Sequence, residues 1–249
     1  MSDAESVPLV FVGPNGVRTA VLWRVAEAIR HRRASIDWER PWRDPDGDQA
    51  DEPVESYELQ GLSLLDFARA QGAPVDVFAW SSGAFTALHA ATEDPSAFRK
   101  LYLYEPPYRA RDDATTWQRW RFFESAVMSF MGVGRASRRA FWRMVSPRDD
   151  GRCGFDRLPT NARDALVDAS GPVLLEMFAG TGEELGISLS RLTTKVLVLV
   201  GERSHATVQR AADRLVAAVP FGTVVEVRDG DHLAPIAAPE RVGAAILGC

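Results

Sequence analysis

The sequence predicts an α/β protein, with a mostly parallel central sheet of about six strands, helices on both faces of the sheet and an inserted helical cap. Short continuous apolar runs, which are typical of strands buried on both faces, alternate along the chain with longer segments of helical apolar spacing. This alternation is interrupted between residues 108 and 192, where helical patterns alone are found. The alternation predicts the parallel sheet, and the interruption predicts the cap.

The N-terminal part of the chain begins with a strand and a helix. The apolar run PLVFVG predicts a strand at residues 8–13, and the apolar spacing in TAVLWRVAEAIR predicts a helix at residues 19–30. Residues 39–55 are polar and rich in Pro, Gly and Asp, so we expect a surface loop there. A second helix is predicted from Ser56 to Gln71. Its expected apolar stripe consists of Leu59, Leu62, Leu65 and Phe67.

The rest of the core is predicted on both sides of the cap. Further strands are expected at residues 75–79, 101–104, 195–201 and 223–227. Helices are expected at residues 83–91, around Val208 to Val219, and after Pro239. We therefore expect residues 1–107 and 193–249 to form the core and residues 108–192 the cap. The cap carries an aromatic stripe at Trp120, Phe123, Val127 and Phe130.

Composition and charge exclude some classes of partner. The chain has 249 residues and a formal net charge of -5, and it has no long run rich in Lys and Arg, so nucleic acid is not expected as a partner. No apolar stretch approaches the roughly 20 residues that cross a bilayer. The polar start MSDAESVP does not resemble a signal peptide, and we expect a cytoplasmic protein that does not bind a membrane. The oligomeric state is left open.

The sequence does not predict a cofactor or a metal. The Gly-rich segment from Gly13 to Gly16 has neither the dinucleotide-binding spacing nor the lysine of a phosphate loop. Cys153 and Cys249 do not have metal-ligand spacing to each other or to a histidine, and we expect both to be free thiols.

A candidate nucleophile lies between a predicted strand and a predicted helix, in the segment AWSSG at residues 79–83. This segment resembles the nucleophile elbow G-x-S-x-G of the α/β-hydrolase superfamily, with Ala79 in place of the first glycine. The elbow requires small residues on both sides of the serine because strand and helix backbones approach closely there. The resemblance implies that Ser81 is a nucleophile. The alternative is that Ser81 only caps the following helix.

A serine nucleophile needs a base, and the chain contains four histidines. His232 lies in DGDHLAPIAAPERV, between the last predicted strand and the last predicted helix, which is similar to the histidine loop of the superfamily. The resemblance implies that His232 is the general base, and the alternative is a surface histidine. His31 and His89 fall in or beside predicted helices and are expected to be structural.

The acid position departs from the commonest pattern of the superfamily. The usual Asp would follow the strand at residues 195–201, and Ser204 occupies that place. Glu105 ends the earlier strand at residues 101–104, where some branches, haloalkane dehalogenases among them, carry the acid. The resemblance therefore implies a Ser81, Glu105, His232 order.

Three alternatives to this acid remain, namely Glu202 as the acid, a dyad without an acid, and a structural role for Glu105. Dehalogenases of this type use an aspartate nucleophile, so Ser81 argues against that reaction.

The oxyanion hole is a second departure, because the His-Gly pair usual after the first central strand is absent from the segment at residues 13–16. Backbone donors in the superfamily come from the residue after the nucleophile, here Ser82, and from the first loop, where Asn15 or Gly16 is the candidate. Pro14 has no N–H group. The alternative for this loop is a plain tight turn.

The resemblance implies a serine hydrolase that acts on a small-molecule ester, lactone or thioester without a cofactor. Aromatic residues beside the nucleophile and in the cap favour an apolar or aromatic substrate, although a cap buries such residues whatever it binds. These residues are Trp80, Trp117, Trp120, Phe123, Phe130, Phe141 and Trp142. One alternative is a biosynthetic tailoring enzyme on the same fold that eliminates or cyclises. The other is an inactive binding protein.

Overall fold

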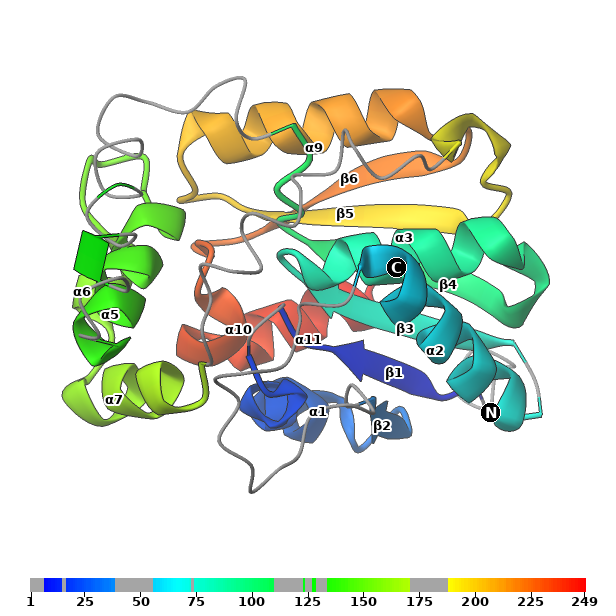
Figure 1. Ribbon diagram of the computed structural model, residues 1–249, viewed down its shortest axis with the longest axis horizontal. Helices are drawn as coiled ribbons and strands as arrows, with labels where there is room; N and C mark the ends of the chain where they lie inside the picture. Colours follow the sequence, from blue (N-terminus) through cyan, green and yellow to red (C-terminus); the bar gives the residue numbers. More distant parts are fainter. Residues whose placement is uncertain are drawn as a thin grey trace.

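The central sheet contains six strands in the order β2-β1-β3-β4-β5-β6, and every neighbouring pair is parallel (Figure 1). The computed structural model describes residues 7–14, 17–38, 56–72, 74–109, 123, 127–128, 134–170 and 188–249. The strands are β1 (Leu9–Val12), β2 (Ser35–Asp37), β3 (Val75–Trp80), β4 (Phe98–Tyr104), β5 (Lys195–Gly201) and β6 (Gly222–Val227). The predicted fold class is confirmed.

Helices cover both faces of the sheet. The α-helices are α1 (Trp23–Ile29), α2 (Tyr57–Ala70), α3 (Gly83–Glu93), α5 (Gly134–Val145), α6 (Gly154–Arg157), α7 (Thr160–Asp168), α9 (Ala206–Ala218), α10 (Ala234–Ala237) and α11 (Pro239–Leu247). Short 3-10 helices are η2 (Thr19–Leu22), η3 (Pro95–Ala97) and η5 (Leu189–Arg191). Helices α2, α3 and α9 pack on one face, and α1, α10 and α11 pack on the other.

The two cores follow from the period of the strands. In β1, Val10 and Val12 join the core beneath α2, α3 and α9, whereas Leu9 and Phe11 join the opposite core. Successive side chains of a strand point to opposite faces, so a strand between two helical layers is apolar at every position. This is why the buried strands are visible in the sequence as continuous apolar runs.

Strand β2 was not predicted, because its sequence lacks such a run. Its residues SID are half-buried to exposed, and the strand pairs with β1 at the edge of the sheet. An edge strand needs fewer apolar side chains than a central one.

The predicted apolar stripe of α2 is wrong at two positions. Leu59 and Leu62 are exposed, at 50% and 39% of their surface, while Gly61 and Gln60 face α3. A Cβ atom at Gly61 would lie 2.8 Å from Cβ of His89, so the glycine permits a close helix crossing. Gln60 Oε1 also accepts a hydrogen bond from the Thr86 hydroxyl at 3.0 Å. The buried face of α2 thus includes a glycine and a paired polar residue beside its apolar residues, and hydropathy alone does not indicate these two.

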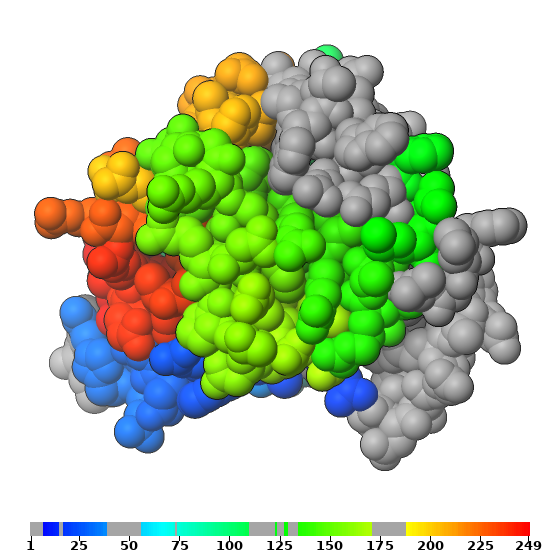
Figure 2. All heavy atoms as spheres, turned by 90° about the vertical axis from the view of Figure 1, so that its left-hand side faces the viewer, coloured from blue at the N-terminus to red at the C-terminus, as the bar shows by residue number. Residues whose placement is uncertain are grey.

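Helices α5, α6 and α7 lie together beyond the carboxyl ends of the strands (Figure 1). Figure 2 looks onto this end of the molecule, where the three helices lie beside α10 and α11 and beside the region of η2 and α1. Trp142, Phe155 and Leu166 pack into the same core cluster as Trp80 of β3. The three helices fall in the segment expected to form the cap, and the division of the chain into core and cap stays a prediction.

Part of the predicted aromatic stripe of the cap is described. Phe123 and Val127 are exposed. Trp117, Trp120 and Phe130 lie outside the described residues. Among the helices that are described, none is both long enough and apolar enough to cross a membrane.

Candidate active site

Ser81 lies in a strained turn between β3 and α3. Its backbone φ angle is 53°, in the left-handed region that residues other than glycine seldom adopt. Its N–H group donates to the carbonyl oxygen of Tyr104 at 2.8 Å, and its own carbonyl accepts from the N–H of Ala84 at 3.1 Å. Positive φ values at non-glycine residues cluster at functional sites, where the surrounding structure holds them in place. The geometry agrees with the elbow that the sequence resembles.

Close backbone packing explains the small residues around Ser81. A Cβ atom at Gly83 would overlap the carbonyl oxygen of Gly13, which follows β1. Ala79 is fully buried and pairs with Val12 of β1 and Leu103 of β4. A methyl group fits at this position, which accounts for alanine where the superfamily pattern has glycine.

The carboxylate of Glu105 faces His232. Glu105 follows β4, has a φ angle of 45° and is buried, and its N–H group donates to the carbonyl oxygen of Leu199 at 2.9 Å. The distance from Glu105 Oε2 to His232 Nδ1 is 2.9 Å. The other oxygen, Oε1, accepts from the N–H of Gly201 at 2.9 Å and from the hydroxyl of Ser204.

His232 is buried, and its second ring nitrogen, Nε2, is buried with it. A carboxylate accepts a hydrogen bond from Nδ1 when this nitrogen carries the proton, and in the neutral ring Nε2 then carries a lone pair. Nε2 has no hydrogen-bond partner among the described residues. A neutral imidazole held in this way is suited to accept a proton from a nucleophile.

Three contacts hold the loop that carries His232. The indole Nε1 of Trp80 donates to the carbonyl oxygen of His232 at 3.0 Å. The hydroxyl of Tyr104 donates to the carbonyl oxygen of Asp231 at 2.7 Å, and Arg148 forms an ion pair with the Asp231 carboxylate. Burial, with the charges of Glu105 and Asp231, raises the pKa of Tyr104 well above its ordinary value, so its hydroxyl stays protonated and keeps donating.

The alternatives to Glu105 and His232 occupy other places. Glu202 is exposed, and its Oε2 accepts from the N–H of Asp229 at 2.8 Å. His31 is exposed, His89 is buried beside α2, and His205 caps α9 by accepting from the N–H of Thr207. The geometry favours Glu105 as the partner of His232.

The candidate oxyanion donors are described only in part. Ser82 precedes α3 and makes no side-chain capping bond, so its contribution would come from its backbone N–H at the start of the helix. Asn15 and Gly16 lie outside the described residues. Trp80, expected to line a substrate pocket, is fully buried and stacks on Trp142, with ring centroids 5.7 Å apart. Its role as a substrate contact stays a prediction.

A model of the alpha/beta hydrolase family matches residues 9–245 of the sequence. The chain belongs to the alpha/beta hydrolase family. The curated proteins searched include none whose sequence matches.

Solved structures of this fold resemble the chain over almost its whole length. MenH from S. aureus superposes with a TM-score of 0.72 at 16% identity, covering 97% of this chain and 92% of the other. Est816, described as an N-acyl homoserine lactone degrading enzyme, gives 0.73 at 13% identity, with 98% and 93% covered. A thermophilic esterase from Thermogutta terrifontis gives 0.72 at 18% identity, with 98% and 89% covered. At these identities the likeness establishes the fold alone.

The sequence did not point to the residues that hold Glu105 and the histidine loop in place. The sequence shows Ser204 at the place of the usual acid, but it does not indicate the hydrogen bond from Ser204 to Glu105. Tyr104, Arg148 and Asp231, which hold the histidine loop, were not singled out at all. A polar residue at the usual acid position, together with a glutamate at the earlier strand, is the signal that points to Ser204.

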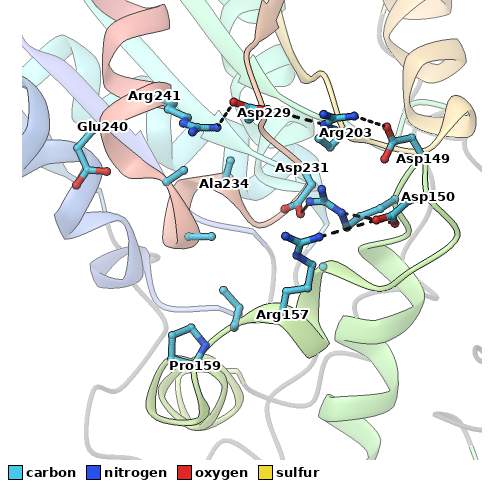
Figure 3. Close-up of a pocket in the computed structure, with 15 residues that line it drawn as sticks. Asp149, Asp150, Arg157, Pro159, Arg203, Asp229, Asp231, Ala234, Glu240 and Arg241 are labelled. Carbon is cyan, nitrogen blue, oxygen red and sulfur yellow. Dashed lines mark hydrogen bonds and ion pairs between the residues drawn. The ribbon is translucent and has the colours of Figure 1, made fainter.

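A charged cavity of about 870 Å³ lies beside the histidine loop (Figure 3). Arg148 and Asp231 line it, and further ion pairs join Arg203 to Asp149 at 3.3 Å and Arg241 to Asp229 at 2.9 Å. Most of the residues that line this cavity are charged, whereas the pocket predicted beside the nucleophile is aromatic.

Replacing Gly83 with alanine should destabilise the elbow. The added methyl group meets the rigid backbone of Gly13, and we expect the free energy of unfolding, measured by urea denaturation, to fall by about 2–3 kcal/mol. The matched control is Gly134→Ala in α5, where a Cβ atom would lie 3.4 Å from the flexible end of Arg138. An equal effect of the two substitutions would contradict the close approach of β1 and α3.

Proposed function

We propose that the protein is a serine hydrolase that cleaves a small-molecule carboxylic ester, lactone or thioester. Ser81 is the nucleophile, His232 the general base and Glu105 the acid that orients His232. The observation that carries this proposal is the 2.9 Å contact between Glu105 and His232, which leaves His232 Nε2 as a proton acceptor. The strained elbow at Ser81 supports it.

The reaction follows from the roles of these groups. His232 Nε2 takes the proton of the Ser81 hydroxyl while the serine oxygen attacks the carbonyl carbon. Glu105 stabilises the imidazolium that forms. The oxyanion accepts hydrogen bonds from the N–H of Ser82 and from Asn15 or Gly16. The imidazolium then protonates the leaving alcohol or thiol, and a water molecule activated by His232 releases the acid from Ser81.

The names of similar structures support the substrate class. A lactone-degrading enzyme and an esterase share the fold of this chain, and both names describe cleavage at a carboxylic ester or lactone. We further propose that the segment at residues 108–192 forms a cap over the nucleophile and supplies an apolar or aromatic lining, to which Phe141 and Trp142 contribute.

The test is the time course of product release from p-nitrophenyl esters, followed by a panel of lactones and thioesters. We expect a burst of p-nitrophenol stoichiometric with the enzyme, because an acyl group accumulates on Ser81 before water releases it. Ser190→Ala, which removes an exposed hydroxyl from η5, is the control and should keep the burst. A protein that releases no product from any member of the panel would contradict the proposal and would favour the tailoring enzyme or the binding protein.

A further inference from the structure

We propose that Ser204 is a positioning residue, which holds the carboxylate of Glu105 in the orientation that His232 requires. This inference rests on the proposed function. Ser204 lies in the turn after β5, is buried, and donates its hydroxyl proton to Oε1 of Glu105. Ser204 contacts Glu105, and Glu105 contacts His232, so Ser204 acts on the histidine through Glu105.

The carboxylate of Glu105 needs more than one donor. Glu105 is 2% exposed, and a buried carboxylate needs hydrogen-bond donors to offset the loss of its hydration. The N–H of Gly201 and the hydroxyl of Ser204 both donate to Oε1, while Nδ1 of His232 faces Oε2. A carboxylate forms stronger hydrogen bonds than a neutral acceptor does, so the two donors on Oε1 hold the group in place.

The same two donors fix the direction of Oε2. The terminal torsion of a glutamate is broad, so the carboxylate plane is set by its hydrogen bonds and not by rotamer preference. With Oε1 held from two sides, Oε2 is left pointing at Nδ1 of His232. Without the Ser204 hydroxyl, the carboxylate is held on that side by the Gly201 N–H alone.

Ser204 itself is held rigidly. Its N–H donates to the carbonyl oxygen of Gly201 at 3.0 Å. Ser204 also pairs with Arg148 in an isolated antiparallel β-bridge. Two further backbone hydrogen bonds lie on either side. The N–H of Asp149 donates to the carbonyl oxygen of Arg203 at 3.0 Å, and the N–H of His205 donates to the carbonyl oxygen of Pro147 at 3.2 Å. Residues 147–149, which follow α5, therefore hold the turn by backbone hydrogen bonds. These bonds fix the position from which the Ser204 hydroxyl donates to Glu105.

A spectroscopic test measures the contact without any substrate. We expect the proton between Glu105 and His232 to give a far-downfield resonance in the proton NMR spectrum. We expect Ser204→Ala to shift or broaden this resonance, Ser204→Thr to preserve it because the hydroxyl remains, and Glu105→Ala to abolish it. A resonance that is the same in Ser204→Ala and in the wild type would overturn the inference. This readout decides the role of Ser204 even if no ester is cleaved, so its failure is distinct from failure of the proposed function.

A double-mutant cycle of Ser204 and Glu105, measured on kcat, distinguishes a role of Ser204 in positioning Glu105 from a general contribution of Ser204 to the stability of the fold. We expect Ser204→Ala to lower kcat about tenfold at unchanged KM, since a hydrogen bond to a charged group is lost, and Ser204→Thr to restore most of the rate. In a Glu105→Ala background the same change should have no further effect, because its target is gone. An equal loss in both backgrounds, or a loss that Ser204→Thr does not restore, would overturn the inference.

Discussion

Ser81→Ala is expected to lower kcat on an activated ester by about 10⁶-fold, the largest effect in this account. The substitution removes the atom that attacks the carbonyl and leaves Glu105, His232 and the oxyanion donors in place. The residual rate should come from substrate binding and the oxyanion hole alone. Because the side chain is small and half-buried, we expect the free energy of unfolding to change by less than about 1 kcal/mol.

The non-additivity of two substitutions sharpens this prediction. His232→Ala alone should cost about as much as Ser81→Ala, and the double variant should be no slower than either, because the two residues act as one unit. The rates are measured with the same ester under saturating conditions. Losses that multiply in the double variant would show that Ser81 and His232 act independently, which contradicts the mechanism.

The second large effect is expected for Glu105→Gln, which should lower kcat by about 10⁴-fold. The amide keeps the shape of the side chain but carries no charge, so it cannot stabilise the imidazolium and can hold His232 in the wrong tautomer. The matched control is Glu202→Gln, because Glu202 is exposed and contacts Asp229. We expect the control to stay within about threefold of the wild type, a change of less than about 1 kcal/mol in the barrier.

The same pair of variants tests the alternatives for the acid. A larger loss for Glu202→Gln than for Glu105→Gln would transfer the role to Glu202. Full activity in both variants would favour a dyad of Ser81 and His232 without an acid.

The fold could be predicted from the sequence because its central strands are buried on both faces. Continuous apolar runs at β1 and β5 follow directly from that burial. The edge strand β2 and the buried face of α2 could not be predicted in the same way. At Gly61 the deciding factor is the distance to His89 in another helix, and hydropathy carries no information on that distance.

The sequence indicates the residue types and the chain order of the candidate site, but it does not indicate the contacts between the residues. Sequence reasoning left Glu105, Glu202 and a dyad open, because the acid and His232 are 127 residues apart and their meeting depends on the turn at the end of β4. The role of Ser204 depends on a contact across 99 residues, which no local pattern encodes.

The assignment of Ser81 as an activated nucleophile is tested by the mass of the intact protein after treatment with a fluorophosphonate, which labels an activated serine. We predict one adduct on the wild type, none on Ser81→Ala, and greatly slowed labelling of His232→Ala, because the hydroxyl then lacks its base. Ser190→Ala should be labelled like the wild type. An unlabelled wild type, or an adduct that persists on Ser81→Ala, would contradict the assignment of Ser81 as the nucleophile.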